Sequence, residues 1–598
     1  MLFRSIAVAD PKIQFGLPEV TLGLMPGATG VTKMTRLLGL MGAQPYILEG
    51  KLFNPAEALE LQLVHELVAT REQLLPAALA HIATHPHAVQ PWDDKNYKMP
   101  GGTPANPKIA GALTVAPAML KKTTRGRYPA PEAALAAMVE GAMVDYDTAL
   151  RVESRYLARL MTGPVARNMI NTFFFDMNAI KSGKSRPGSA PRYKPQKVGI
   201  LGAGMMGAGI AWAQASRGIA TVLKDVSTEK AEAGKAYSAK LTQARVDKGR
   251  MTAEAQQALL SRITPTASAA DLAGCDLIIE AVFESRDLKA KVTQETEPQL
   301  APGGFFASNT STLPISSLAT ASSQPEKFVG IHFFSPVDKM KLVEIIRGKQ
   351  TDDETMARAF DYVQALGKVP IVVNDSRGFY TSRTFGTFVM EGAAMLGEGI
   401  PAAVIENAGV LAGMPVGPLA VLDETALSLS VHVLDQTRAD LAAEGKTYTA
   451  TPGELLVEMM VKELKRPGRA ASAQGGGGFY DYPAGQKKTL WPELKTRFEK
   501  TGVSWDLPTL KDRLLYRQAV ETARCLSEGV LTSVHDANIG SIFGIGFPAW
   551  TGGAMQFIYG AGIDAFEQRC AELAAQYGPG FALSEAVKNT IRQHQPQY

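Results

Sequence analysis

The stretch Lys197–Asp225 constrains the fold more than any other part of this 598-residue chain. It reads KVGILGAGMMGAGIAWAQASRGIATVLKD. The apolar run 197–201 predicts a short buried strand, and an Ala-rich helix pattern follows it to about Arg217. The run 219–223 then predicts a second strand. A strand, helix and strand in this order are typical of a parallel α/β sheet of the Rossmann type.

Three glycines, Gly202, Gly204 and Gly207, stand between the first strand and the helix as G-x-G-x-x-G. In a dinucleotide site the first makes a tight turn, the second lets the backbone approach a pyrophosphate, and the third lets the helix pack closely. The helix N-terminus offers free N–H groups to the phosphates. Asp225 stands where an acid accepts hydrogen bonds from the adenosine ribose, and it would repel a 2′-phosphate. The context predicts an NAD site, and a glycine-rich turn in another α/β sheet is the alternative.

Composition excludes several classes of protein. The net charge is only +4, and acids and bases are interspersed, so nothing suggests a nucleic-acid partner. The cysteines Cys275, Cys525 and Cys570 form neither a metal spacing nor a disulfide framework, which favours a cytoplasmic location. The first ten residues lack the apolar core of a signal peptide. The charge-free run 538–563 is long enough to span a bilayer, but Pro548 and many glycines interrupt it, so we expect no transmembrane segment.

The C-terminal part contains an internal repeat. The segment Glu391–Ile400 (EGAAMLGEGI) matches Glu521–Val530 (ETARCLSEGV), 130 positions later. A Gly-x-Pro triplet follows each copy, at 413–415 and at 546–548. We therefore expect two copies of one helical unit, separated by the glycine run in 473–483.

His332 is the strongest catalytic candidate. It lies in the predicted strand 329–337, 21 residues after Ser311 and 12 before Glu344. A histidine can take a proton near neutral pH, and a carboxylate on its second nitrogen would fix the tautomer. A hydroxyl such as that of Ser311 could hold a substrate oxygen. Spacing alone favours the alternative, a hydrogen-bonded core histidine.

A resemblance to a known family favours the catalytic interpretation of His332. The region 197–374 resembles the NAD domain of the L-3-hydroxyacyl-CoA dehydrogenases in the motifs LGAGMMG, EAVFE, SNTST and HFFSPVDKMKLVE. The resemblance implies that His332 is the catalytic base, that Glu344 is its partner, and that Ser311 contacts both substrate oxygen and cofactor. It also implies a set of cofactor contacts: Gly202, Gly204, Met206, Gly207, Asp225, Val282, Phe283, Glu284, Lys289, Ser311 and Ser335.

Two positions depart from the common pattern of that family. Ser335 stands where the family often has asparagine, three residues after the histidine. Ser382, in GFYTSR, replaces a substrate-contacting asparagine. Serine keeps a donor and an acceptor but is shorter, so substrate geometry or chain-length preference is expected to differ.

The first 85 residues resemble the second half of the crotonase (enoyl-CoA hydratase) fold, in the run KIQFGLPEVTLGLMPGATG. Glu19 matches one of the two catalytic carboxylates of that family, and its alternative role is a capping acid before a turn. The other carboxylate and the N–H groups that hold the thioester oxygen lie earlier in the family's fold. We therefore expect a truncated hydratase remnant, through a truncated gene model or an internal start, and a loss of hydratase activity. A chain that is still bifunctional is the alternative.

Taken together, the chain resembles the α subunits of bacterial fatty-oxidation complexes. This implies oxidation of (S)-3-hydroxyacyl-CoA to 3-oxoacyl-CoA with NAD, a separate thiolase subunit as partner, and an oligomer. A largely structural subunit and a dehydrogenase of another substrate, such as a sugar acid, are the rival interpretations. His81, His85 and His87 form a cluster without supporting acids or cysteines, so no metal site is expected.

The domain order follows from these motifs and from the polar, Pro-punctuated linker 182–195. We expect five regions: a crotonase-like remnant at 1–85, a helical connector and linker at 86–194, a Rossmann NAD-binding domain at 195–375, and helical copies at 376–485 and 500–598.

Overall fold

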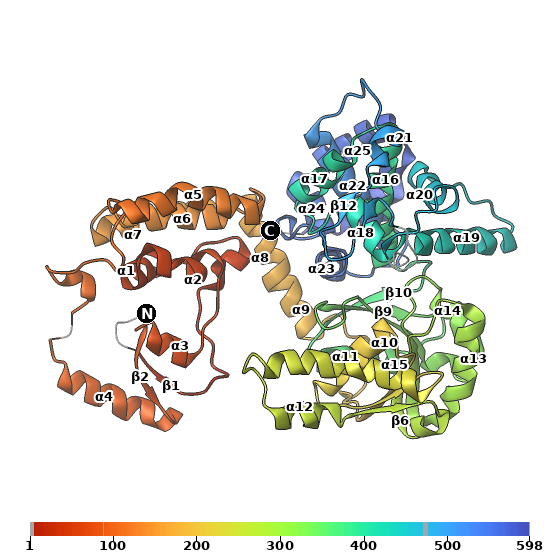
Figure 1. Ribbon diagram of the computed structural model, residues 1–598, viewed down its shortest axis with the longest axis horizontal. Helices are drawn as coiled ribbons and strands as arrows, with labels where there is room; N and C mark the ends of the chain where they lie inside the picture. Colours follow the sequence, from red (N-terminus) through yellow and green to blue (C-terminus); the bar gives the residue numbers. More distant parts are fainter. Residues whose placement is uncertain (1–4, 88, 470–476, 597–598) are drawn as a thin grey trace. The chain divides into compact units, whose positions relative to one another are not determined.

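The computed structural model describes residues 5–87, 89–469 and 477–596 (Figure 1). The chain forms two compact units. The first runs to Phe174 and includes Trp550–Gly552, and the second comprises Phe175–Ala549 with the residues from Gly553 onward. Residues 473–476 of the predicted flexible run, which include Gly475 and Gly476, lie outside the described residues.

The first unit pairs two parallel strands and packs helices around one core. The strands are β1 (Ser5–Val8) and β2 (Val64–Val68). The helices are α1 (Gly30–Gly42), α2 (Gln44–Leu48), α3 (Pro55–Glu60), α4 (Leu74–Thr84), α5 (Pro107–Thr124), α6 (Pro129–Gly141), α7 (Tyr146–Met161) and α8 (Pro164–Ile170). Buried apolar residues of α1, α2 and α6 make up much of the core, so α6 is a structural part of this unit.

The second unit is built on a sheet of eight strands among the described residues, in the order β10-β9-β8-β7-β6-β3-β4-β5. Their bounds are β3 (Lys197–Leu201), β4 (Ala220–Lys224), β5 (Ile263–Thr266), β6 (Cys275–Glu280), β7 (Leu300–Ser308), β8 (Phe328–Phe333), β9 (Leu342–Arg347) and β10 (Val369–Asn374). Neighbours are parallel except β8 and β9, which are antiparallel. The Rossmann-type fold expected from the sequence is therefore confirmed.

The helices that connect these strands are α10 (Met205–Ala215), α11 (Thr228–Val246), α12 (Ala253–Leu260), α13 (Arg286–Thr296), α14 (Ile315–Leu318) and α15 (Asp353–Ala365). The strands are almost continuously apolar because helices cover both faces of a parallel sheet. In β8 all six residues are buried. The short edge strand β5 escaped sequence analysis because its four residues contain Pro265 and carry no long apolar run.

The segment after Phe174 packs onto the sheet domain. Ile180, in α9 (Met177–Lys181), is fully buried in the core of the second unit. Arg186 donates to Asp361 of α15 through Nε at 2.8 Å and Nη2 at 2.9 Å, and the Tyr193 N–H donates to the same carboxylate at 2.8 Å. The two units consequently divide before the polar linker 182–195, not within it.

Two helical series follow the sheet, with matching order, and this confirms the duplicated all-α region. The first comprises α16 (Thr381–Glu398), α17 (Ala402–Ala412), α18 (Pro418–Thr425), α19 (Leu427–Ala443) and α20 (Pro452–Lys462). The second comprises α22 (Leu507–Ser527), α23 (Val534–Ile545), α24 (Ala554–Ala561), α25 (Ile563–Tyr577) and α26 (Glu585–Gln593). The hairpin β11 (Tyr480–Asp481) and β12 (Thr489–Leu490) and the helix α21 (Glu493–Phe498) lie between them.

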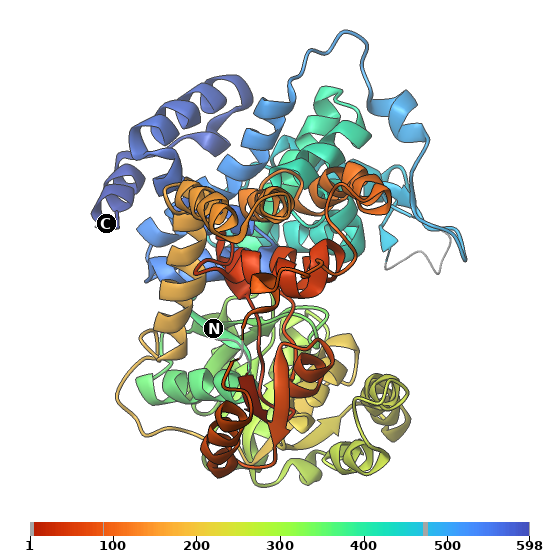
Figure 2. The same ribbon diagram turned by 90° about the vertical axis from the view of Figure 1, so that its left-hand side faces the viewer.

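Both helical series lie on the β10 side of the sheet (Figures 1 and 2). The loop between α22 and α23 extends that edge, because the Asn374 N–H donates to the Val530 carbonyl at 2.8 Å and Val373 bridges Leu531. The charge-free run 538–563 folds into α23 and α24, which are interrupted at Gly546. No helix of the described part of the chain is long and apolar enough to cross a membrane.

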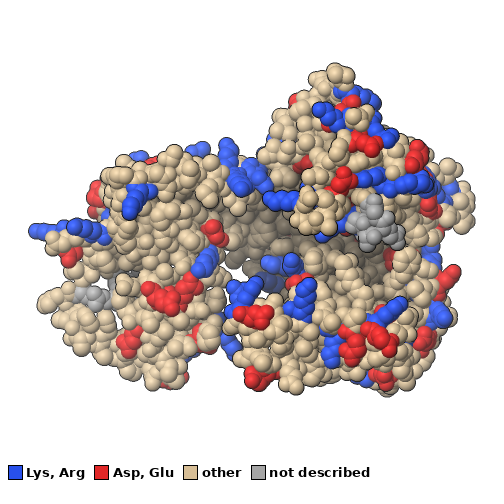
Figure 3. Space-filling model, viewed as in Figure 1, with Lys and Arg blue, Asp and Glu red and all other residues tan. Residues whose placement is uncertain are grey.

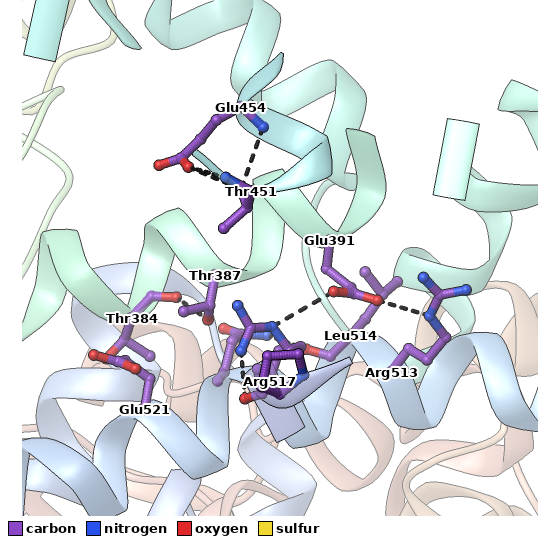
Figure 4. A network of polar contacts seen from close by, with 12 residues as sticks. Thr384, Thr387, Glu391, Thr451, Glu454, Arg513, Leu514, Arg517 and Glu521 are labelled. Atoms are coloured by element: carbon purple, nitrogen blue, oxygen red, sulfur yellow. Dashed lines mark hydrogen bonds and ion pairs between the residues drawn. The ribbon is translucent and has the colours of Figure 1, made fainter. Parts of the chain in front are cut away.

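Reciprocal ion pairs join the two helical copies. In each copy one arginine binds two glutamates of the other, and the residues correspond at a spacing of 130 positions: Arg383 with Glu521 and Glu528, and Arg513 with Glu391 and Glu398. Figure 4 shows Glu391 between Arg513 and Arg517. The repeat seen in the sequence therefore marks the surface along which the two copies pack.

Replacing Arg513 by methionine is expected to destabilise the helical region by about 3–5 kcal/mol, because it leaves the buried Glu391 carboxylate without its nearest partner. Arg513 is 1% exposed and contacts Glu391 at 2.7 Å and Glu398 at 2.6 Å. The midpoint of urea unfolding, followed by circular dichroism, measures the change. Lys588→Met removes a surface ion pair with Glu585 and should leave the midpoint unchanged. Equal midpoints for the two variants would contradict the expectation.

Candidate active site

Each glycine of the turn after β3 has its own structural reason. Gly202 has φ +93°, and a Cβ there would lie 2.8 Å from the Ala281 carbonyl. A Cβ on Gly207 would lie 1.8 Å from the Gly202 carbonyl, so helix and turn pack backbone to backbone. A Cβ on Gly204 would have no neighbour within 4 Å. The turn is therefore closed on two sides and open at the position where a pyrophosphate would approach.

The surroundings of the turn fit a bound dinucleotide. No side chain caps α10, whose N-cap is Gly204, so its first N–H groups are available to an anion. Met206, in the first turn of α10, is half-buried. Asp225, at the end of β4, accepts hydrogen bonds from the N–H groups of Ala203 at 2.6 Å and Val226 at 2.7 Å. Its carboxylate thus lies directly beside the glycine turn, where a ribose hydroxyl would be recognised.

A buried ionic network underlies the loop after β6. The Lys289 ammonium is 2% exposed and binds Glu280 at 2.9 Å and Glu284 at 3.2 Å. Burial alone would lower the pKa of Lys289, but the two glutamates raise it above its usual value. Burial likewise opposes ionisation of Glu284, yet the charge of Lys289 and the Thr310 hydroxyl hold its pKa below the usual value. Lys289 is thus placed to hold Glu284, with little surface of its own for a ligand.

Glu284 in turn organises the loop after β7. It accepts hydrogen bonds from the Thr310 hydroxyl at 2.5 Å and the Ser311 N–H at 3.2 Å. Val282 is half-buried next to it, and Phe283 is 72% exposed, with its ring 6.2 Å from that of His432 in α19. The carboxyl ends of β6 and β7 therefore carry the residues expected to contact the cofactor, as in other open α/β sheets.

His332 and Glu344 are direct partners across β8 and β9. The His332 Nδ1 lies 3.0 Å from Glu344 Oε2, and the two residues are 7% and 0% exposed. With Nδ1 donating to the carboxylate, the neutral ring presents Nε2 as a proton acceptor. The Phe334 ring lies 4.5 Å from the imidazole ring and restricts its surroundings to apolar groups on that side.

The start of α16 supplies the other partners of Glu344. Its Oε1 accepts hydrogen bonds from the N–H groups of Tyr380 at 3.0 Å and Thr381 at 3.1 Å. Its Oε2 also accepts one from the Thr381 hydroxyl at 2.6 Å. These donors compensate for the complete loss of water around the carboxylate. The first helix of the helical region thus holds the carboxylate that orients His332.

The three serines singled out in the sequence lie in the loop after β7, in the loop after β8 and at the start of α16. The Ser382 hydroxyl donates to the Ser311 carbonyl at 2.9 Å, which ties α16 to the loop after β7. Ser335 is exposed, and its hydroxyl lies 3.5 Å from the Met205 sulfur at the glycine turn. The structure thus connects all three serines to the loops that carry the catalytic and cofactor candidates.

Several supporting residues escaped sequence analysis. They are Glu280, Asn309, Thr310, Tyr380 and Thr381. Asn309 lies within the motif SNTST, and its side chain accepts a hydrogen bond from the Phe333 N–H at 2.8 Å. Its position inside this motif was the sequence feature that could have identified it as a supporting residue. Tyr380 acts through its backbone N–H group and Thr381 partly so, and no residue pattern reveals such backbone contacts.

Glu19 belongs to the first unit. It is half-buried in the short 3₁₀ turn Pro18–Leu22, and its Oε2 has no hydrogen-bond partner among the described residues. His81 and His85 stack with ring centroids 4.2 Å apart. No group of three metal-ligating side chains occurs in the described residues.

The glycine turn with its acid and the buried His–Glu pair define an NAD-dependent dehydrogenase. Three family models match the chain: the 3-hydroxyacyl-CoA dehydrogenase NAD binding domain at residues 197–376, its C-terminal domain at 378–482, and enoyl-CoA hydratase/isomerase at 1–89. A 3-hydroxybutyryl-CoA dehydrogenase from Escherichia coli shares the fold, with a TM-score of 0.56 and 22% identity over 67% of this chain and 99% of that one.

Curated relatives match nearly the whole chain. The fatty acid oxidation complex subunit alpha of Shewanella putrefaciens is 32% identical over 592 residues, which is 98% of this chain and 81% of the relative. The corresponding subunit of a Psychrobacter species is 32% identical over 596 residues, or 97% and 80%. The chain therefore belongs to the family of fatty acid oxidation complex α subunits.

Proposed function

We propose that the enzyme oxidises (S)-3-hydroxyacyl-CoA to 3-oxoacyl-CoA. The buried His332–Glu344 pair, which belongs to the same unit as the glycine turn, carries this proposal. His332 Nε2 removes the proton of the C3 hydroxyl while Glu344 holds the ring and stabilises the imidazolium. NAD⁺, when bound, takes the hydride from C3. Formation of NADH from 3-hydroxybutyryl-CoA or a longer homologue tests the reaction, and a panel of sugar acids tests the rival dehydrogenase.

Ser311 and Ser382 are proposed to shape the acyl site. The Ser382–Ser311 hydrogen bond supports this role, because it ties the two segments on which a substrate oxygen would rest. Restoring the family's asparagine in Ser382→Asn would break that contact and add one bond of length. Rates across acyl chain lengths, compared with the wild type, show whether this position contributes to chain-length preference.

Asp225 should make the enzyme prefer NAD⁺ over NADP⁺, because its carboxylate would repel a 2′-phosphate. Asp225→Asn keeps an acceptor for the Ala203 N–H but removes the charge. We expect NAD⁺ to bind about tenfold more weakly, a change of about 1.4 kcal/mol, and the preference to narrow. Dissociation constants of both cofactors measure this. Asp247→Ala, at an exposed acid just beyond α11, is the matched control. Equal binding of both cofactors by the wild type would exclude the ribose assignment.

Varying the salt concentration distinguishes a direct hydrogen bond from Asp225 to the ribose from a general effect of its charge on cofactor binding. Screening weakens a long-range effect of an exposed charge, whereas a hydrogen bond to the ribose persists at high ionic strength. The ratio of the two dissociation constants should therefore remain in favour of NAD⁺ in concentrated salt.

We further propose an acyl-CoA-processing assembly in the cytoplasm, with a separate thiolase subunit and an oligomeric state. The relatives' name, subunit of a complex, supports a partner. The three cysteines, buried and unpaired, support a reducing compartment. Acids and bases are interspersed on the face in Figure 3. Sedimentation of the chain with and without a purified thiolase tests the partner, and NAD-dependent turnover separates an enzyme from a purely structural subunit.

The expected loss of hydratase activity stays a prediction. The enoyl-CoA hydratase/isomerase model matches residues 1–89, which include Glu19. Crotonyl-CoA hydration by the purified chain is the measurement, with Glu19→Gln as the comparison. Robust hydration by the wild type that disappears in Glu19→Gln would contradict the expectation and favour a bifunctional enzyme.

A further inference from the structure

The loop 334–341 joins the strand of His332 to the strand of Glu344. Its conformation therefore bears on both members of the pair. The loop also lies against the helix of the dinucleotide motif. Val337 is 2% exposed and packs closely on α10, since a Cβ added to Gly209 would lie 2.8 Å from the Val337 Cβ. Through Ser335 it reaches Met205. One loop thus connects the proton-accepting pair to the cofactor turn.

Lys368 binds two backbone carbonyls of this loop. It precedes β10, and its ammonium donates to the carbonyls of Val337 and Met340, at 2.6 Å each. Charge-assisted hydrogen bonds of this kind are about twice as strong as neutral ones. The same side chain thereby fixes two turns of the loop, one next to α10 and one next to β9.

Two other hydrogen bonds tie the loop to its neighbours, but they do not involve the carbonyls that Lys368 binds. Asp338 accepts a hydrogen bond from the Tyr237 hydroxyl of α11 at 2.8 Å, and the Val369 N–H donates to the Lys341 carbonyl at 2.8 Å. These hold one point in the middle of the loop and one at its C-terminal end. Neither reaches the carbonyls of Val337 and Met340, which would lose strong partners if the ammonium were removed.

We propose that Lys368 is a positioning residue for the dehydrogenase reaction, which holds the loop 334–341 so that the His332–Glu344 pair and the glycine turn keep one relative geometry. This rests on the proposed function. A displacement of about 1 Å between a catalytic group and its substrate can reduce a rate about 10²-fold. Lys368 touches neither, so its effect passes through the loop.

Lys368 is expected to lose its positive charge at moderately alkaline pH. Burial lowers its pKa to about 8, while Asp338 opposes this fall and the Arg217 guanidinium adds to it. Below that pH the ammonium holds both carbonyls with its charge, and above it the neutral amine donates weaker bonds. The geometry of the loop should consequently loosen as pH rises through about 8.

Steady-state kinetics of three variants test the proposal. Lys368→Met should lower kcat about 10-fold to 100-fold and leave KM for the acyl-CoA within about threefold. Lys368→Arg, which stays charged, should keep most of kcat and move the alkaline fall of the wild-type profile to higher pH. Lys339→Met, at an exposed lysine of the same loop, is the control and should behave as wild type. An unchanged alkaline limb in Lys368→Arg, or wild-type kcat in Lys368→Met, would overturn the proposal.

Hydrogen exchange separates this inference from the proposed function. Amides of 334–341 should exchange faster in Lys368→Met than in wild type or in Lys339→Met, whatever substrate the enzyme takes. If Lys368→Met exchanges faster but the wild type never reduces NAD⁺, the proposed function is rejected and the anchoring of the loop by Lys368 is retained. Unchanged exchange would reject the role of Lys368 even in a fully active dehydrogenase.

Discussion

His332→Ala is expected to lower kcat by roughly 10²–10⁴, the contribution of a positioned general base. The reason is geometric: Glu344 occupies Nδ1 at 3.0 Å, so Nε2 is the nitrogen that remains for the hydroxyl proton. Glu344 is fully buried and is bonded to the other side of the ring, so its carboxylate does not replace the imidazole as the base. Formation of NADH under saturating substrate measures kcat directly.

The variant must be separated from a folding defect. The imidazole is 7% exposed, and its removal leaves a small space beside Phe334. NADH binding should persist in His332→Ala, because the glycine turn and Asp225 do not contact His332. His594→Ala, at the C-terminal end of α26, is the matched control and should keep wild-type turnover. Near-normal turnover in His332→Ala would remove His332 from the mechanism.

Glu344→Gln is expected to lower kcat by between about 10² and 10⁴, although the side chain keeps its size. The glutamine oxygen can still accept from the N–H groups of Tyr380 and Thr381, but its amide nitrogen then faces the His332 ring. An amide that donates to Nδ1 forces the proton onto Nε2. The ring then presents a donor to the substrate hydroxyl and no longer accepts its proton.

Thr381→Val is the graded comparison for this effect. It removes only the 2.6 Å hydrogen bond from the Thr381 hydroxyl to Glu344 Oε2 and leaves the backbone donors in place. A hydrogen bond to a charged group contributes about 1.5–3 kcal/mol, so a smaller fall of kcat than in Glu344→Gln is expected. A Glu344→Gln enzyme within tenfold of wild type would show that the tautomer of His332 is not set by this carboxylate.

The stability of these variants should follow a different order from their activity. Glu344→Ala leaves the buried N–H groups of Tyr380 and Thr381 without an acceptor, at a cost of about 1–3 kcal/mol each. Glu344→Gln satisfies both. An inactive but stable Glu344→Gln next to a destabilised Glu344→Ala would therefore separate the catalytic role of the carboxylate from its structural one.

Features that depend on local backbone conformation could be predicted from the sequence. The turn at Gly202, Gly204 and Gly207 was predicted from residue spacing, because a positive φ and a close helix approach each require glycine at a defined position. The two helical copies were predicted from the repeat at Glu391 and Glu521, because similar sequences form similar helices. The family resemblance added the pairing of His332 with Glu344, which spacing alone could not establish.

Only the tertiary structure shows how these parts are held together. The antiparallel pairing of β8 and β9 places Glu344 opposite His332, and the fold brings Thr381 to the same carboxylate from the following helix. Lys289 is buried between two glutamates, and Lys368 reaches the loop 334–341 from the position just before β10. The reason is physical: hydrophobic periodicity specifies which residues face a core, whereas strand order and burial decide which distant polar groups meet there.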